Sequence, residues 1–356
     1  MSINNVLRQV DHYRRQRMSL LEPMLYKALG NDTYRRAELI PASHVQTILI
    51  VRNNKRIGNM FFLLPFVKQM RAAYPHAHIT LLLSQPWQGQ IFEEIGIDNI
   101  VYSHFSAGKL WSFYKQMQQL KTQVFDLLVT SYSSSEDSLI ASMIPARNKV
   151  ASDHPGRNSA FTHVFNNATA EKHSAFHKLF LVERLTKQKL NRASHEMAFT
   201  VQELSEGIVA KHALCQDKEL TIAFFRGARG AKKLSDKTWH GILDTLQTYS
   251  SVPIQWVEIL SPDIQTPLIA NGLTYQNNNI RVLGSFLKNT TAFLSCDTGP
   301  LHLADAAGAK CIGLFTHTCP KKYGVLGQDS INVEDIHSLE MKAYLTRLSR
   351  PSSFTH

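Results

Sequence analysis

The stretch SCDTGPLHLA, residues 295–304, marks a junction between a buried strand and a helix. An apolar run precedes it, and a helical pattern begins at Leu301. Gly299 lets the backbone turn sharply, and Pro300 suits the first turn of a helix, where its missing N–H is not needed. The amides of Leu301 and His302 are then expected to point outward from the positive end of the helix dipole, where a phosphate oxygen can bind. The alternative is an ordinary strand–turn–helix junction with a capping side chain.

Strands and helices alternate on both sides of this junction. Towards the C-terminus the pattern predicts strands at 220–225, 254–260, 292–296 and 310–315, with helices at 236–249, 281–288, 301–307 and 336–348. Towards the N-terminus it predicts strands at 46–52, 78–84, 99–102 and 125–132, with helices at 59–73, 86–95, 109–123 and 135–143. Several of these strands are nearly continuous apolar runs, which is typical of strands covered on both faces in a parallel sheet.

The two alternating series predict two domains. A chain of 356 residues exceeds the usual size of a single hydrophobic core. Residues 153–200 are polar and rich in histidine, and the boundary between the domains is expected near 200–218. We therefore expect an α/β protein in which two Rossmann-like domains, at 46–205 and 206–335, face each other across a cleft. A helix and a polar tail, residues 336–356, end the sequence.

Residues 1–45 differ in character from the rest of the sequence. Apolar residues recur there at loosely helical spacing among arginine and lysine residues. Pro23 argues against a single unbroken helix. We interpret the segment as a basic helical extension that packs on the first domain. The alternative is a basic amphipathic segment that contacts anionic lipid.

Composition argues against several classes of protein. Hydrophobic residues make up 44% and charged residues 19% of the sequence, as in a globular protein. No apolar run approaches the roughly 20 residues of a bilayer-spanning helix, and the N-terminus lacks the apolar core of a signal peptide, so we expect a cytoplasmic protein. The four cysteines and sixteen histidines show no metal-binding spacing, so neither a metal nor another cofactor is expected.

The net charge of +11 favours anionic partners such as phosphorylated substrates or an acidic membrane surface. Nothing in the sequence resembles a helix-turn-helix, zinc-finger or RNP motif, so nucleic acid is not expected as a partner. No G-x-G-x-x-G pattern follows the first predicted strand, which argues against a nicotinamide-dependent oxidoreductase.

Residues 297–308, DTGPLHLADAAG, resemble the D-[ST]-G-x-x-H-x-A-x-A-x-G signature of glycosyltransferase family 9, whose heptosyltransferases have the two-Rossmann-domain GT-B fold. In that family the motif lies at the pocket for the nucleotide-sugar donor, so the resemblance implies that Asp297 lies near the donor sugar. It implies further that the donor diphosphate is held by the turn and the helix start, Thr298, Gly299, Pro300, Leu301 and His302.

Three further stretches resemble the family in the expected order. Residues 48–60 are similar to its first strand and the following loop, which ends in I-G-D. Residues 125–138 are similar to a strand and a small-residue loop that face the acceptor. Residues 226–234 are similar to a strand end and a loop whose lysine neutralises donor phosphate, a role that the resemblance gives to Lys232.

Other polar residues are weaker candidates for the site. The donor ribose normally needs a carboxylate just after the second strand of its domain, and Glu258 and Asp263 are equal candidates. His104 and His154 are further candidates for the cleft, and the alternative for both is a solvated loop histidine.

The sequence departs from the family at the position of its catalytic base. The family's I-G-D aspartate is replaced by Asn59, which follows Gly58, and an amide cannot accept a proton at neutral pH. Another carboxylate can replace the base, with Glu136 and Asp137, next to Ser134 in the acceptor loop, as the nearest candidates. A second alternative is that the leaving diphosphate is stabilised well enough for a weakly assisted attack. The third is that the protein binds donor and acceptor without turnover.

The resemblance implies an inverting glycosyltransferase that moves a sugar, by default heptose from ADP-heptose, onto an acidic lipopolysaccharide inner-core acceptor. The alternative is a catalytically impaired sugar-nucleotide-binding protein of the same fold, because Asn59 replaces the family's base. Acceptors of this family lie at the cytoplasmic face of the inner membrane, and a basic first domain suits that surface. Contact with the membrane surface is therefore a further expectation.

Overall fold

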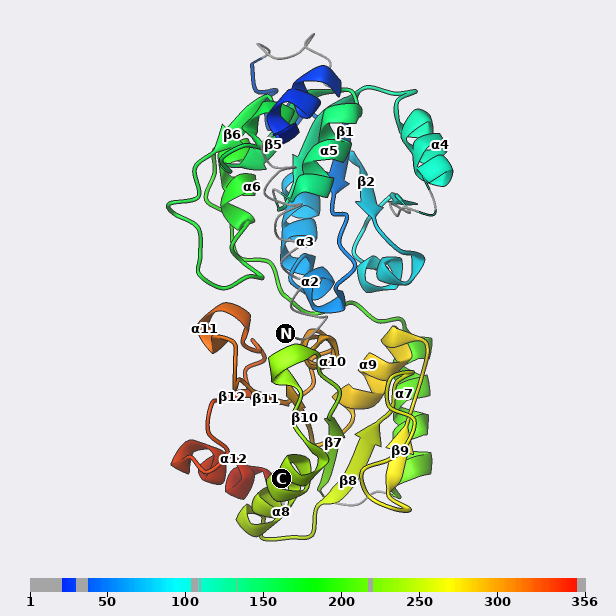
Figure 1. Ribbon diagram of the computed structural model, residues 1–356, viewed down its shortest axis with the longest axis vertical. Helices are drawn as coiled ribbons and strands as arrows, with labels where there is room; N and C mark the ends of the chain where they lie inside the picture. Colours follow the sequence, from blue (N-terminus) through cyan, green and yellow to red (C-terminus); the bar gives the residue numbers. More distant parts are fainter. Residues whose placement is uncertain are drawn as a thin grey trace, which may run out of the picture.

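The computed structural model describes residues 21–29, 38–103, 108, 110–132, 134–216 and 220–350. They form two lobes stacked along the long axis of the molecule, each built around one parallel sheet (Figure 1). The upper lobe in that view contains the first six strands, and the lower lobe contains the last six.

The first sheet has the strand order β3-β2-β1-β4-β5-β6, and every neighbouring pair is parallel. The order reverses between β1 and β4, the doubly wound arrangement that places a binding crevice at the carboxyl ends of these two strands. The strands are β1 (Thr47–Val51), β2 (His78–Leu83), β3 (Asn99–Tyr102), β4 (Phe125–Thr130), β5 (Ala146–Ser152) and β6 (His163–Phe165).

The second sheet repeats this topology with the order β12-β11-β10-β7-β8-β9, again wholly parallel. Its reversal lies between β7 and β10. The strands are β7 (Thr221–Phe225), β8 (Gln255–Ile259), β9 (Leu273–Tyr275), β10 (Ala292–Cys296), β11 (Cys311–Leu314) and β12 (Ile331–Val333). The two-sheet α/β fold expected from the sequence is thus confirmed.

Helices cover both faces of each sheet, which is why the central strands are buried along their length. In the first lobe these are α2 (Ile57–Phe61), α3 (Leu64–Ala73), α4 (Leu110–Leu120), α5 (Ser135–Met143) and α6 (Leu179–Thr186). After them come α7 (Val201–Cys215), α8 (Asp236–Tyr249), α9 (Ile280–Lys288), α10 (Gly299–Ala306), α11 (Pro320–Tyr323) and α12 (Leu339–Leu348). Short 3₁₀ helices are η2 (Ala42–His44), η3 (Pro86–Phe92), η5 (Asn158–Ala160) and η6 (Gly230–Lys232).

The sequence pattern missed four strands: β5, β6, β9 and β12. Strand β5 reads ARNKVAS, and its polar residues hide the apolar run that the other buried strands show. The other three have only three residues each, too few to establish a period.

Two helices also differ from the prediction, and a third lies in the expected boundary region. The helix expected at 59–73 is divided into α2 and α3, with a proline in the first turn of α3. The helix expected at 86–95 is the 3₁₀ helix η3. Helix α7 spans most of the region 200–218 and packs against α9 of the second lobe.

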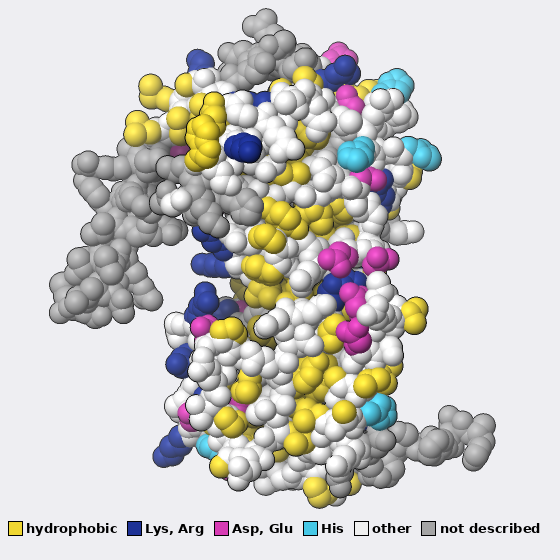
Figure 2. Space-filling view, turned by 90° about the vertical axis from the view of Figure 1, so that its right-hand side faces the viewer, with side chains coloured by type: hydrophobic (Ala, Val, Ile, Leu, Met, Phe, Trp, Pro, Cys, Tyr) yellow, Lys and Arg dark blue, Asp and Glu magenta, His cyan; other side chains and the backbone are white. Residues whose placement is uncertain are grey.

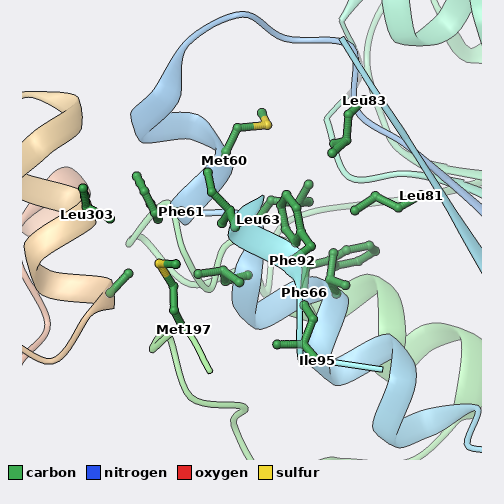
Figure 3. Close-up of a cluster of buried hydrophobic side chains, with 14 of the residues drawn as sticks. Met60, Phe61, Leu63, Phe66, Leu81, Leu83, Phe92, Ile95, Met197 and Leu303 are labelled. Carbon is green, nitrogen blue, oxygen red and sulfur yellow. The ribbon is translucent and has the colours of Figure 1, made fainter. Parts of the chain in front are cut away.

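One hydrophobic core runs from the first lobe into the second. Figure 3 shows Phe61 of α2 directed towards Leu303 of α10, with Met197 from the connecting segment beside them, and all three are buried. Arg281 of α9 adds a polar link, because its guanidinium donates to the carbonyl oxygen of Gln90 at 2.8 Å and to that of Ala198 at 2.7 Å. The lobes therefore share a packed junction on one side of the cleft.

Residues 21–29 of the expected N-terminal extension form a helix on the first lobe. Tyr26 is 1% exposed and belongs to the same core cluster as Phe113 and Met117 of α4. The carboxylate of Glu22 pairs with Arg157 at 3.2 Å. Residues 1–20, 30–37 and 351–356 lie outside the described part of the chain, so the expectations for them are not addressed.

Candidate active site

The two segments that the sequence singled out most strongly touch each other across the cleft. Gly299, the first residue of α10, approaches Ile57 of α2 so closely that a Cβ atom at this glycine would lie 1.8 Å from the Ile57 Cγ2 atom. Gly58 packs in the same way, since a Cβ there would lie 3.0 Å from Cδ2 of His302. Glycine at both positions thus allows the loops of the two lobes to meet.

The structure around α10 corrects two local expectations. Gly299 is not among the glycines with positive φ, so it serves the close approach to Ile57 rather than a left-handed turn. The amide of His302 does not point freely outward, because it donates to the Thr298 carbonyl oxygen at 3.3 Å. The Thr298 hydroxyl lies 2.9 Å from the hydroxyl of Ser295. Pro300 lies in the first turn of the helix, as predicted.

Asp297 follows β10 and is the centre of a polar network. Its Oδ2 accepts from Lys232 Nζ at 2.5 Å, and its Oδ1 lies 2.9 Å from His302 Nε2. The Lys232 ammonium also donates to the Asp297 carbonyl oxygen at 3.0 Å. Burial alone would raise the pKa of Asp297, but the hydrogen bonds from His302 and Lys232 outweigh burial and hold this pKa well below its usual value. Asp297 is therefore an ionised carboxylate whose charge is balanced by Lys232.

Aromatic side chains from both lobes surround His302. The Phe62 ring lies 4.5 Å from the His302 ring and 6.1 Å from that of Tyr323, measured between centroids. His173 packs edge-on against Phe62, and its Nε2 lies 2.9 Å from the Gly324 carbonyl oxygen of the other lobe. Burial lowers the pKa of His173. These contacts form a largely apolar wall beside the Asp297 network.

Asn59 lies in α2 at the side of the cleft that belongs to the first lobe. Its Nδ2 donates to Oδ1 of Asn54 at 3.1 Å, and the side chain is half-buried. The loop before it is fixed further at Asn53, whose Nδ2 donates to Oε2 of Glu136 at 2.7 Å and whose Oδ1 accepts from the Ser103 hydroxyl at 2.5 Å. Asn59 and Glu136 thus belong to one hydrogen-bonded loop region.

The two carboxylates expected near Asn59 differ in environment. Glu136 is exposed to solvent, and partial burial of its carboxyl raises its pKa above the ordinary value. Asp137 is fully buried, pairs with Arg52 at 3.1 Å and accepts from the Asn53 amide at 2.6 Å. Ser134 caps α5 by accepting from the Asp137 amide at 3.1 Å. Asp137 and Ser134 therefore hold the loop, whereas Glu136 stays exposed to solvent.

The two candidates for the donor ribose also differ. Glu258 is 2% exposed, and its two oxygens accept from Arg226 Nε and from the Leu268 amide, each at 2.6 Å. Asp263 is exposed, with its carboxylate 3.9 Å from Arg229. Neither lies in the Asp297 network, and a ribose role for either one stays a prediction.

Charged side chains are distributed unevenly around the cleft. Figure 2 shows Lys and Arg side chains along one edge of the waist between the lobes, with Asp and Glu gathered on the opposite edge. Exposed cations occur beside the contacting segments, at Lys55, Arg56, Lys233, Lys321 and Lys322. The half-buried His154 lies 3.1 Å from Arg157, and His104 lies outside the described residues.

Within the described ranges, no group of three or more His, Cys, Asp or Glu side chains is arranged to hold a metal ion. All four cysteines are free thiols, three of them buried. No helix in the described part of the chain is long and apolar enough to cross a membrane.

Residues 113–348 match the model of glycosyltransferase family 9 (heptosyltransferase), which is more than half of the chain. The chain belongs to glycosyltransferase family 9. It is accordingly a glycosyltransferase, as expected from the sequence. The matched region includes Lys232 and Asp297 but begins after the segment that contains Asn59. No curated protein sequence matches the chain significantly.

Solved structures of family 9 proteins share the fold. A glycosyltransferase family 9 protein of Veillonella parvula has a TM-score of 0.70 at 16% identity, with 84% of this chain and 88% of that chain covered. Heptosyltransferase WaaC of E. coli with ADP has a TM-score of 0.63 at 14% identity, covering 81% and 92%. The E. coli ADP-heptose lps heptosyltransferase II has a TM-score of 0.64 at 14% identity, covering 85% of this chain and 96% of that chain. These likenesses confirm the expected GT-B architecture.

Sequence reasoning assigned no role to several residues that shape the cleft. Arg52 lies in the segment 48–60 and Tyr132 in the segment 125–138, but nothing in the sequence shows that their side chains meet. Lys178 directly precedes α6, and no motif in the sequence singles it out. Phe62 lies just outside α2, and only the folded chain places its ring against His302.

Proposed function

We propose that this family 9 enzyme transfers a sugar with inversion from a nucleotide-sugar donor, by family likeness heptose from ADP-heptose, to an acidic glycan acceptor. The observation that carries the proposal is the Lys232–Asp297–His302 network at the start of α10, which meets the segment of α2 that carries Asn59. In support, related structures are described as WaaC with ADP and with ADP-2-deoxy-2-fluoro heptose. We assign the donor to residues 206–335 and the acceptor to residues 46–205.

In this mechanism Lys232 stabilises the leaving nucleoside diphosphate. The Lys232 side chain is 32% exposed, so its ammonium can exchange part of its contact with Asp297 for a phosphate oxygen. Asp297 then holds Lys232 in position and accepts hydrogen bonds from hydroxyls of the donor sugar. Preorganised cations of this kind act where charge develops in the transition state.

Glu136 is the carboxylate that replaces the missing base in this proposal. It is exposed, it is bonded to the loop that leads to Asn59, and its raised pKa increases its basicity. Asn59 orients the acceptor hydroxyl through its amide, and Glu136 takes the proton as the anomeric carbon is attacked. Asp137 is unsuited to this role because it is fully buried and paired with Arg52.

Membrane contact is the further part of the proposed function. The helix at 21–29 exposes Leu21, Met24 and Leu25, and its Tyr26 belongs to the same core cluster as α4. Helix α4 in turn exposes Trp111 and Tyr114. Apolar and aromatic side chains beside lysines suit the interface of an anionic membrane. A flotation assay with vesicles of neutral and of anionic lipid tests this, and binding to neither contradicts it.

Calorimetric titration with ADP, ADP-heptose and other nucleotides, followed by transfer assays on truncated lipopolysaccharide, tests the main proposal. Selective binding with transfer is the expected result. Binding without turnover that Asn59→Asp restores supports the second candidate, a sugar-nucleotide-binding protein that has lost its base. Absence of binding by every nucleotide contradicts both.

A further inference from the structure

A second polar cluster lies at the carboxyl edge of the first sheet, apart from the Asp297 network. It forms where the strand order reverses, between β1 and β4. Arg52 directly follows β1, and Ser131 directly follows Thr130 at the end of β4. Ligands of doubly wound sheets bind at such reversals, because the flanking loops diverge there.

The cluster contains one more buried cation than carboxylate. Arg52 is 3% exposed and pairs with Asp137. Lys178 is 7% exposed, and its ammonium donates to the Ser152 hydroxyl at 2.7 Å. No carboxylate in the described ranges pairs with Lys178. Burial lowers its pKa, and the positive charge of Arg52 acts on it in the same direction. Because buried charges are normally paired, one positive charge here lacks its counter-ion.

The same place holds two hydrogen-bonding atoms without partners. Arg52 Nε and the Ser131 hydroxyl are buried and make no hydrogen bond in the described structure. Each of these residues is at most 3% exposed. Buried polar groups are nearly always satisfied, so two such donors beside the buried ammonium of Lys178 indicate an occupant that accepts hydrogen bonds.

Tyr132 connects this cluster to the cleft. The guanidinium carbon of Arg52 lies 4.2 Å from the centroid of its ring, and Lys178 Nζ lies 5.4 Å from it. The Tyr132 hydroxyl donates to the Ser174 carbonyl oxygen at 3.1 Å, and the Ser174 amide in turn donates to the Lys322 carbonyl oxygen of the other lobe at 2.9 Å. Tyr132 is half-buried, and through Ser174 it links the two cations to the other lobe.

We propose that Arg52, Lys178 and the Ser131 hydroxyl form a binding site for one anionic group, a carboxylate or a phosphate, of the acceptor. A carboxylate or phosphate oxygen accepts several hydrogen bonds at once and supplies the missing negative charge. The site is distinct from the donor diphosphate site, which uses Lys232. Its place in acceptor recognition rests on the proposed function, but the anion binding does not.

The pKa of Lys178 depends on the charges around its ammonium group. Burial, together with the charge of Arg52, lowers the pKa of Lys178 to about 8. An anion bound between the two cations would raise this pKa again. Lys178 therefore offers a spectroscopic readout that does not depend on sugar transfer.

The test follows the ¹³Cε resonance of Lys178 in protein labelled with ¹³C-lysine and assigned with Lys178→Met. Glucuronate and glucose 6-phosphate serve as probes, since they carry a carboxylate and a phosphate, and glucose is the neutral control. We expect one or both charged sugars to shift the resonance and glucose to leave it unchanged. The probe that binds more tightly identifies the anion. No shift with either charged sugar overturns the proposal.

Two variants separate binding from folding. Lys178→Met should weaken binding of the preferred probe about 10-fold or more, whereas Lys115→Met on the exposed face of α4 should leave it unchanged. Ser131→Ala removes one unpartnered hydroxyl, so it should weaken the probe by several-fold without lowering the melting temperature. Equal binding by Lys178→Met and the native protein overturns the proposal.

ADP titrations on the same preparations keep the two hypotheses distinguishable. Lys178→Met should bind ADP as the native protein does, because the donor site lies on the other lobe. If the charged sugars bind at Lys178 and no nucleotide binds anywhere, the proposed function fails and the anion site stands. If ADP binds and transfer occurs but the Lys178 resonance never responds, the proposed function stands and the anion site fails.

Discussion

The carboxyl edges of the two sheets face the same cleft, yet they differ in the balance between buried cations and carboxylates. In the second lobe the buried carboxylate of Asp297 is balanced by Lys232, and its other oxygen lies 2.9 Å from His302 Nε2. In the first lobe the buried carboxylate of Asp137 pairs with Arg52, and Lys178 has no carboxylate partner within the described ranges. Two sheets of the same strand order thus carry a balanced site and an unbalanced one.

The difference shows what each half requires of its ligand. A balanced network can be rigid before the ligand arrives, and it needs only a shift of Lys232 towards phosphate. Two buried cations with one carboxylate between them are costly to bury, and they favour the binding of an anion. The same topology can therefore prepare one lobe for a leaving group and the other for an acidic acceptor.

The largest effect is expected from a substitution on the acceptor side, in the first lobe. Glu136→Gln removes the proposed base but keeps a hydrogen-bonding group near Asn53, so kcat should fall by about 10²–10⁴-fold with little change in ADP binding. In the native enzyme, transfer should be lost as pH falls through the raised pKa of Glu136, because the base must be ionised. The pH profile of kcat measures this. An unchanged kcat in Glu136→Gln would contradict the assignment.

The next largest effect is expected at the balanced network of Asp297 and Lys232, in the second lobe. Lys232→Ala leaves Asp297 without its cation and removes the charge expected at the leaving diphosphate, so transfer should fall by about 10²–10³-fold. Lys232→Arg keeps the charge and should recover part of the rate. Lys233→Ala, at the exposed neighbouring lysine, is the matched control. Steady-state transfer and donor binding are the measurements, and undiminished transfer in Lys232→Ala would remove it from the mechanism.

A smaller effect tests the contact that joins the two sides. Gly299→Ala places a Cβ where the Ile57 side chain lies, so the free energy of unfolding should fall by about 1–3 kcal/mol. The double variant Gly299→Ala with Ile57→Ala should recover part of that loss. Urea unfolding measures both. The substitution Gly241→Ala, at a surface position where a Cβ meets open space, serves as the control. Equal stability of Gly299→Ala and the native protein would contradict close packing of α2 on α10.

The smallest effect sharpens the comparison through pH. The pKa of Lys178 is about 8 in the folded protein, below its ordinary value of 10.5. Between these pH values the unfolded chain holds more protons, so the free energy of unfolding should rise with pH by at most about 1.4 kcal/mol per unit. Lys178→Met should remove this slope, and Lys115→Met should not. Denaturation curves at several pH values measure it, and an equal slope in Lys178→Met would show that the lysine is not responsible.

Much of the fold could be predicted from the sequence because it depends on local patterns. The apolar runs of β1, β2, β4 and β10 identify buried parallel strands whatever their neighbours are. The strand–turn–helix motif at residues 295–304 gives α10 with its early proline. Strand β5 escaped prediction because its polar residues are buried by tertiary contacts that no local pattern contains.

The sequence by itself determined the α/β class, the order of strands and helices around the central motifs, the positions of Asp297 and Lys232, and the replacement of the family's base by Asn59. Only the tertiary structure decided that Gly299 is needed for close contact with Ile57, that Asp137 is a buried partner of Arg52, and that Lys178 lies beside it without a counter-ion. The physical reason is that apolar periodicity records which side of an element is buried, whereas charge balance depends on which distant side chains the fold brings together.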